Sequence, residues 1–202
     1  MVLPALIAAL LLACQTEPLG RSWEGRPIEV VHVRGDGPRI LVVGCIHGNE
    51  CEGTEVTRLL ARRTPNADLW LVHQLNPDGY ARRSRFNARG VDLNRDFLAA
   101  TQRETRIARK LILRLEPDLT IWFHQPQAVV RAWGPSRAVA RRYARLAGEP
   151  YRAWEWPPGS ASRWQNGIGQ LSFVVELGSG ELPDAVARRH ADAIVRIAGE
   201  LG

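Results

Sequence analysis

The stretch Ile40–Glu50 reads ILVVGCIHGNE, and it joins a buried strand to polar side chains at the end of that strand. Its first part, Ile40 to Cys45, is a short, continuous apolar run, which is typical of a central strand covered on both faces. His47 and Glu50 follow directly. In sheets of mostly parallel strands, ligands gather at the carboxyl ends of the strands. An imidazole and a carboxylate three residues apart at this place can therefore point at a common ion.

Predicted strands and helices alternate along the rest of the chain. Further strands are expected over residues 28–33, 69–75, 119–123, 129–133 and 171–176, and amphipathic helices over residues 53–63, 101–115, 136–146 and 184–201. This alternation predicts an α/β fold, a single domain with a mixed, mostly parallel central sheet covered by helices on both faces. Residues 149–169 are rich in Trp and Pro and are expected to form a long aromatic loop.

Composition excludes several classes of protein. The 202 residues are 45% hydrophobic and 24% charged, which argues against disorder, collagen-like repeats and a membrane protein with several spans. The net charge of +6 is the balance of 27 basic and 21 acidic residues, and Lys110 is the only lysine. The arginines are spread in ones and twos, and the chain has no zinc-knuckle spacing, no aromatic-basic run and no basic tail. Nucleic acid is therefore not expected as a partner.

The first 13 residues are uncharged and almost wholly apolar, and they are too few to span a bilayer as a helix. Their length is typical of an export signal, although no Lys or Arg precedes the apolar run. The run ends in Leu11-Leu12-Ala13-Cys14, which resembles a bacterial lipobox. The chain is thus expected to be an exported envelope lipoprotein that reaches the membrane only through a lipid on Cys14. A cytoplasmic protein without a working leader and a buried N-terminal helix are the alternatives.

The expected organisation is a signal over residues 1–13, a polar, turn-rich tether over residues 14–20 and a folded domain over residues 21–202. With Cys14 assigned to lipidation, Cys45 and Cys51 remain. They can form a disulfide in an oxidising envelope or pack as small hydrophobic residues, and the second interpretation is favoured.

A second imidazole and a second carboxylate follow other predicted strands. His124 ends the strand that begins at Leu119, and with His47 and Glu50 it makes a His₂Glu set, the three-ligand pattern of catalytic zinc. Taken alone, His124 would be better explained as a core histidine bonded to the backbone, and a single H-x-x-E arises often by chance. Glu176 ends an otherwise apolar strand, where a carboxylate needs a partner or a function.

Two further motifs complete the pattern. Asn76-Pro77-Asp78-Gly79 follows a strand and is expected to form a turn. Residues 85–97 read RFNARGVDLNRDF. Together with the strand-end residues, these segments resemble the zinc carboxypeptidase family (M14, carboxypeptidase A-like), and within it most closely the small bacterial murein peptide amidases. The resemblance extends from about Leu19 to Gly180 and implies that family's fold in a reduced size.

The resemblance implies one bound Zn²⁺ ion and a role for each residue around it. His47, Glu50 and His124 match the zinc ligands, and Glu176 matches the general base that takes a proton from water. General acid–base groups of this kind act within hydrogen-bond reach of the reacting atoms.

The resemblance also implies roles for the arginine-rich motif. Arg85 matches the arginine that polarises the scissile carbonyl, with Arg82 and Arg83 as nearby competitors for that role. Asn94 and Arg95 match the pair that holds the terminal carboxylate of the substrate, for which a guanidinium is well shaped. Without the zinc set, Asn94 and Arg95 would be explained equally well as a surface turn with a salt bridge.

The chain departs from the family in one segment. The larger carboxypeptidases carry a mobile tyrosine shortly before the catalytic glutamate, whereas the corresponding stretch here contains Tyr151 and the tryptophans Trp154, Trp156 and Trp164. The spacing does not match Tyr151 to that tyrosine. The tryptophans are expected either to line the substrate pocket or to pack the loop.

These inferences predict a monomeric zinc hydrolase that cleaves a peptide or amide bond next to a free carboxylate in a short peptide. A murein stem peptide, cut between γ-D-glutamate and meso-diaminopimelate, is the expected substrate. One alternative is a deacylase of N-acyl amino acids, because the succinylglutamate desuccinylase and aspartoacylase group shares H-G-N-E and D-L-N-R-x-F. Asn76–Gly79 and the leader argue against it. The other alternative is a non-catalytic zinc- or peptide-binding envelope lipoprotein.

Overall fold

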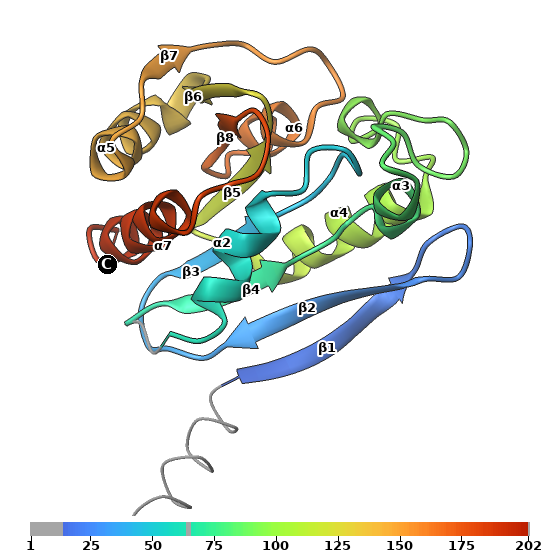
Figure 1. The fold of residues 1–202 in the computed structure, drawn as a ribbon, viewed down its shortest axis with the longest axis horizontal. Coiled ribbons are helices and arrows are strands. Elements are labelled where there is room, and N and C mark those ends of the chain that lie inside the picture. Colours follow the sequence, from blue (N-terminus) through green and yellow to red (C-terminus); the bar gives the residue numbers. More distant parts are fainter. Residues whose placement is uncertain (1–13, 64–65, 202) are drawn as a thin grey trace, which may run out of the picture.

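The computed structural model describes residues 14–63 and 66–201, so the predicted leader over residues 1–13 lies outside the described residues. Eight strands form one mixed sheet in the order β1-β2-β4-β3-β5-β8-β6-β7 (Figure 1). They are β1 (Cys14–Arg21), β2 (Pro27–Val33), β3 (Arg39–Val43), β4 (Asp68–Val72), β5 (Leu119–His124), β6 (Gln127–Ala132), β7 (Tyr151–Ala153) and β8 (Ser172–Gly178). The β3–β4, β3–β5, β5–β8 and β6–β7 pairs are parallel, and the other pairs are antiparallel.

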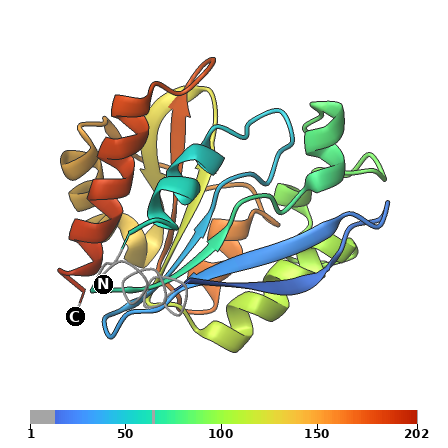
Figure 2. The same ribbon diagram turned by 60° about the horizontal axis from the view of Figure 1, so that its bottom comes forward.

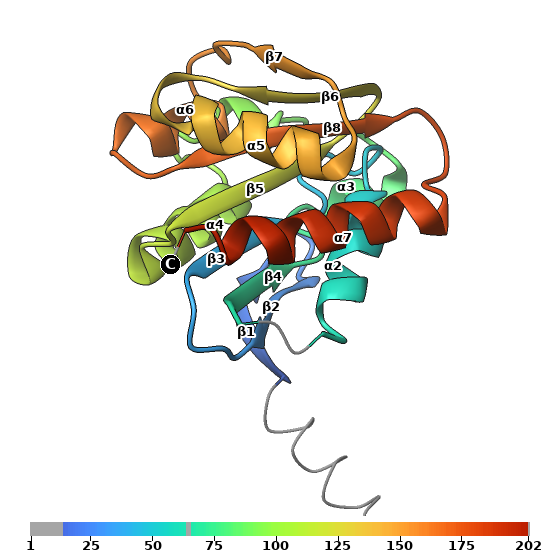
Figure 3. The same ribbon diagram turned by 90° about the vertical axis from the view of Figure 1, so that its left-hand side faces the viewer.

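Helices cover both faces of this sheet, as predicted. Helices α2 (Gly53–Leu60), α5 (Arg137–Ala147) and α7 (Asp184–Ala198) lie on one face, and α4 (Arg103–Leu115) and α6 (Ala161–Gly167) lie on the other (Figures 2 and 3). Strand β3 shows why two cores form. Val42 packs toward α2 and α7 while Leu41 packs toward α4, because successive side chains point to opposite faces.

Residues 14–20, expected to form a tether, instead belong to strand β1. This strand pairs antiparallel with β2, with Gln15 opposite His32, and Leu19 packs against the core beneath α4. The tether prediction is wrong because β1 is an edge strand whose side chains are mostly exposed or half-buried, so it carries little apolar alternation. Among the helices in residues 14–63 and 66–201, none has the length and apolarity needed to cross a membrane.

Two other segments are more ordered than the sequence predicts. Asn76-Pro77-Asp78-Gly79, expected as a turn, begins the short helix α3 (Pro77–Arg82), in which the Asn76 side chain accepts a hydrogen bond from the Gly79 backbone N–H. The segment over residues 149–169, expected as one long loop, contains β7 and α6. Two 3₁₀ turns, η1 (Leu93–Arg95) and η2 (Gly134–Ser136), complete the fold.

A buried histidine lies between α5 and α7, which cover one face of the sheet. His190 is fully buried, and its Nδ1 is 2.8 Å from the hydroxyl of Tyr143. Burial, together with the positive charge of Arg189, lowers the pKa of His190 to about 4, while Glu149 Oε1 lies 3.7 Å from its Nε2. His190 therefore stays neutral in the folded protein at a pH where the unfolded chain already binds a proton.

The free energy of unfolding should fall as the pH drops from about 6.5 to about 4, because protons bind first to the unfolded His190. The contribution of this group is on the order of 3 kcal/mol at most, since each unit of pKa shift corresponds to about 1.4 kcal/mol. Urea unfolding at a series of pH values should show a smaller acid loss in His190→Gln, which keeps an acceptor for Tyr143. Equal pH slopes in the two proteins would contradict this assignment.

Candidate active site

Three parallel strands bring the predicted residues to one edge of the sheet. β5 lies between β3 and β8, with Val43 opposite Trp122 and His124 opposite Glu176. Residues opposite one another in a sheet emerge from the same face, so the side chains of His124 and Glu176 lie next to one another. His47 and Glu50 come from the loop that follows β3, at the same edge. The register of the sheet therefore assembles the site.

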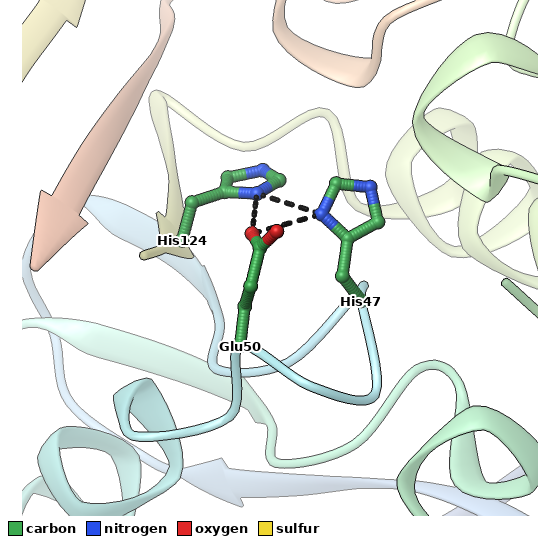
Figure 4. A group of neighbouring side chains, drawn as sticks. All are labelled: His47, Glu50 and His124. Atoms are coloured by element: carbon green, nitrogen blue, oxygen red, sulfur yellow. Dashed lines mark hydrogen bonds and ion pairs between the residues drawn. The ribbon is translucent and has the colours of Figure 1, made fainter. Parts of the chain in front are cut away.

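His47, Glu50 and His124 form a buried group (Figure 4). Glu50 Oε2 lies 2.9 Å from His47 Nδ1 and 3.0 Å from His124 Nδ1, and the two Nδ1 atoms are 3.2 Å apart. Donor atoms of a tetrahedral zinc site lie about 3.3 Å apart, because each is about 2.0–2.1 Å from the ion. Two imidazole nitrogens and one carboxylate oxygen that converge at these distances fit a zinc ion.

The loop that carries these ligands is held from two sides. Cys45 and Cys51 form a disulfide, with Cα atoms 4.6 Å apart, so the prediction that they pack as separate small residues is wrong. The turn between β3 and α2 brings them within the Cα separation that a disulfide needs. On the other side, Gly48 packs on the backbone of Gly79 so closely that a Cβ atom would clash, at 1.9 Å from the Gly79 carbonyl carbon.

Asp92 and Arg85 surround the ligands. Asp92 Oδ1 accepts a hydrogen bond of 2.9 Å from His47 Nε2, and this contact fixes the ring so that Nδ1 faces the metal position. The Arg85 guanidinium donates to the other Asp92 oxygen at 3.0 Å and to Glu50 Oε1 at 2.6 Å. The two oxygens of Glu50 are thus divided between the imidazoles and the arginine.

The charges of this cluster favour the protonation states that a metal requires. Burial opposes the ionisation of Glu50, but hydrogen bonds from His124 and His47 hold the pKa of its carboxyl well below its usual range. Burial lowers the pKa of His124 to about 4. Against burial, the hydrogen bonds to Asp92 and Glu50 raise the pKa of His47. An ionised Glu50 and a neutral His124 are ready-made ligands, and zinc would replace the proton on His47 Nδ1.

Of the three arginines that competed for the carbonyl-polarising role, the structure brings only Arg85 to the ligand group. Arg82 pairs with Glu24 at the surface, and Arg83 lines an open groove whose other walls include the loops that follow β3, β5 and β8. The Arg85 side chain is 35% exposed, and its guanidinium is held by Glu50 and Asp92.

The structure gives Asn94 and Arg95 different surroundings. Asn94 is buried; its Oδ1 accepts from the Ala161 backbone N–H at 2.9 Å, and its Nδ2 is 3.5 Å from His124 Nε2. Arg95 is exposed and donates to the Asn94 carbonyl oxygen, with no carboxylate within 4.0 Å among the described residues. Within the described part of the chain Arg95 therefore does not form the salt bridge of a surface turn, and its guanidinium is available for an anionic ligand.

Glu176 lies in β8 with its side chain buried at the same edge. Its Oε2 atom has no hydrogen-bond partner among the described residues. Burial, reinforced by the negative charge of Glu50, raises the pKa of Glu176 to about 7. A buried carboxylate in this state can accept and release a proton near neutral pH.

An open groove of about 750 Å³ runs beside Glu50. Its walls are the loops that follow β3, β5 and β8 together with α3, and they include Gly48, Tyr80, Arg83, Gln125 and Ser179. Of the three residues in the ligand group, Glu50 is the one that lines this groove.

Sequence reasoning missed Asp92 as a partner of His47, although it lies inside the quoted motif over residues 85–97. The signal that could have found it is the rule that a metal-bound imidazole donates its other N–H to a carboxylate or carbonyl.

Comparison with known proteins agrees with this geometry. The zinc carboxypeptidase family matches residues 12–111. Carboxypeptidase SOL1 from Arabidopsis thaliana is 33% identical over 99 residues, which cover 39% of this chain and 20% of that protein. Metallocarboxypeptidase A from Trichophyton tonsurans is 34% identical over 111 residues, covering 39% and 26%. The chain thus spans about a fifth to a quarter of the length of these curated relatives.

Solved structures resemble the whole described fold. The murein-tripeptide amidase from Escherichia coli O157 superposes with a TM-score of 0.71 and 23% identity, covering 92% of this chain and 91% of its own. Carboxypeptidase A from Helicoverpa armigera gives a TM-score of 0.81 and 16% identity, covering 98% and 70%. At these identities the likeness establishes the fold.

Asp92→Asn should weaken zinc binding by about 10- to 100-fold, because it removes the charge that orients and polarises His47 while keeping a side-chain oxygen in place. The measurement is the Kd for zinc by competition with a chromophoric chelator. Asp192→Asn is the matched control, since Asp192 on α7 forms an exposed ion pair with Arg63. Unchanged zinc affinity in a folded Asp92→Asn protein would contradict the role of Asp92.

Proposed function

We propose that this chain is a zinc-dependent hydrolase that cleaves a peptide or amide bond next to a free carboxylate in a short peptide, because the zinc carboxypeptidase family matches residues 12–111. One observation carries the proposal: a buried His₂Glu ligand group lies at the same sheet edge as Glu176, beside an open groove. The likeness to zinc carboxypeptidases supports zinc-dependent hydrolysis, and the pairing of β5 with β8 places His124 next to Glu176.

His47, Glu50 and His124 would hold the zinc ion, which supplies Lewis acidity that polarises a carbonyl and activates water. Glu176 takes the proton from the attacking water and delivers it to the leaving nitrogen, a step suited to its raised pKa. The exposed part of Arg85 donates hydrogen bonds to the carbonyl oxygen as negative charge develops there.

Arg95 holds the free carboxylate of the substrate, because its guanidinium is exposed next to the site. The side-chain N–H of Asn94 assists Arg95 in holding that carboxylate. The contacts of Asn94 with the Ala161 backbone and with the His124 ring fix the positions of both. Together Asn94 and Arg95 position the scissile bond relative to Glu176, and this proximity contributes to the rate.

We propose a murein stem peptide as the substrate, cut between γ-D-glutamate and meso-diaminopimelate. The support is the fold likeness to the murein-tripeptide amidase, which extends over nearly the full length of both chains. The test is digestion of L-Ala-γ-D-Glu-meso-diaminopimelate by the zinc-loaded protein, with the products identified by mass spectrometry. Cleavage of peptides with ordinary C-terminal residues alone would indicate a plain carboxypeptidase. Cleavage of N-acyl amino acids alone would indicate the deacylase, and no cleavage at all a non-catalytic binding protein.

Glu176→Gln should lower kcat on the cleaved peptide by about 10²- to 10⁴-fold, the usual contribution of a general acid–base group, while zinc content stays stoichiometric. The isosteric amide cannot take a proton from water. Kinetics and metal analysis on the same preparation separate the two properties, and Glu181→Gln is a control on the exposed loop after β8. Full activity in Glu176→Gln would exclude the proposed mechanism.

We also propose export and lipid attachment at Cys14, with the protein monomeric in the cell envelope. The support is the uncharged apolar run over residues 1–13 and the Leu11-Leu12-Ala13-Cys14 ending. Because β1 begins at Cys14, a lipid there would hold the sheet close to the membrane. Cells fed labelled palmitate should label the wild-type and Thr16→Ala proteins and leave Cys14→Ser unlabelled. Label retained in Cys14→Ser would contradict the proposal.

A further inference from the structure

Five buried polar atoms without hydrogen-bond partners lie in the segments next to Glu176. They are Arg131 Nε, Trp156 Nε1, Ser160 Oγ, Ser162 Oγ and Glu176 Oε2. Buried polar atoms in folded proteins nearly always have a partner, so several orphaned atoms in neighbouring segments indicate that a partner comes from outside the chain. Glu176 is explained by its proposed part in hydrolysis, whereas Arg131 is not used by that mechanism.

The sheet places Arg131 on the face that carries Glu176. Strand β6 runs antiparallel to β8, with Val129 opposite Glu176 and Arg131 opposite Val174. Alternate residues of a strand share a face, so Arg131 emerges next to the site. The positive charge of Arg131 acts on Glu176 and opposes the rise of its pKa. Among the described residues no carboxylate lies within 4.0 Å of this guanidinium.

Two tryptophans hold Arg131 against the site. Its Cζ atom is 4.8 Å from the ring centre of Trp154 and 6.0 Å from that of Trp156. Trp156 in turn stacks on His124, with ring centres 6.2 Å apart and an angle of 23° between the planes. Cation–π contacts hold a guanidinium by its flat face and leave its N–H edge free to donate. A continuous path of contacts thus joins Arg131 to a predicted zinc ligand.

The start of α6 joins this region to the carboxylate-binding residues. Ala161, between the two serines with orphaned hydroxyls, donates its backbone N–H to Asn94. Gly159 lies against the carbonyl of Arg95, where a Cβ atom would be 2.1 Å from the oxygen. The backbone of Gly159 and Ala161 therefore packs against Asn94 and Arg95, and Ser160 and Ser162 flank Ala161 in the sequence.

We propose that Arg131 binds a second carboxylate, carried by the side chain of the residue that hydrolysis releases. This inference rests on the proposed function, in which Arg95 holds the main-chain carboxylate of the same residue. Guanidinium groups suit carboxylates because their N–H donors pair with both oxygens. Diaminopimelate, glutamate and aspartate carry the second carboxylate, whereas lysine and glutamine lack it.

Matched peptides that differ only in this carboxylate test the proposal. One pair is L-Ala-γ-D-Glu-meso-diaminopimelate and L-Ala-γ-D-Glu-L-Lys, and the other is a blocked peptide ending in Glu and its Gln counterpart. The zinc-loaded wild-type protein should cleave the diacid member of at least one pair with about 10- to 100-fold higher kcat/KM, the factor expected for a hydrogen bond between charged groups. If the diacid is preferred only in the first pair, the residue that Arg131 recognises is diaminopimelate. If it is preferred only in the second pair, that residue is an acidic amino acid such as glutamate.

Arg131→Gln should remove this preference, mainly through KM, and leave the neutral peptides within about threefold of wild type. Arg131→Lys should retain part of it, and Arg137→Gln, at an exposed position at the start of α5, should retain all of it. Calorimetric titration with meso-diaminopimelate and L-lysine gives a second readout, because only diaminopimelate binding should weaken in Arg131→Gln.

Three outcomes would overturn the inference. A wild-type protein that cleaves both members of each pair equally well retains the proposed function but has no carboxylate subsite. Equal loss of kcat on all peptides in Arg131→Gln would mean that Arg131 acts only on Glu176. Absence of cleavage of every peptide would reject the proposed function, and this inference with it.

Discussion

The buried carboxylate of Glu50 is the contact on which the rest of the site depends. One of its oxygens accepts from His47 and His124, and the other accepts from Arg85. An ionised carboxylate removed from water without such partners would be strongly destabilising. The loop after β3, the end of β5 and the arginine-rich segment must therefore converge here whenever Glu50 is buried. Asp92 extends the network by holding His47 and Arg85 together.

The strands that carry the site were predictable because they are apolar runs. β3, β5 and β8 are buried on both faces, and their composition indicates this without knowledge of the fold. His47, His124 and Glu176 were predictable for a related reason, since they are polar exceptions at or just after the ends of these runs. That these side chains lie close together depends on how β3, β5 and β8 pair, and a local sequence pattern does not specify this pairing.

Other parts depend on distant partners and left little local signal. β1 is a strand because β2 pairs with it, and its exposed side chains gave no alternation. The Cys45–Cys51 disulfide follows from the turn that brings their Cα atoms together. α6 is too short for a helical repeat to be visible, and it is held by contacts such as that between Ala161 and Asn94. In each case tertiary contacts override weak local propensity.

The ligand group and Glu176 come from the parallel strands of the sheet, whereas Arg131 comes from a strand that pairs in the antiparallel direction. The family match over residues 12–111 includes His47, Glu50 and Arg85 but ends before His124 and Glu176. Those two residues reach the site through the parallel pairing of β3, β5 and β8. β6 adds to that core in the antiparallel direction and brings a different arginine to the same face. A substitution on β6 leaves the parallel pairing unchanged, so the residue at the position of Arg131 can vary while the ligand group and Glu176 stay in register.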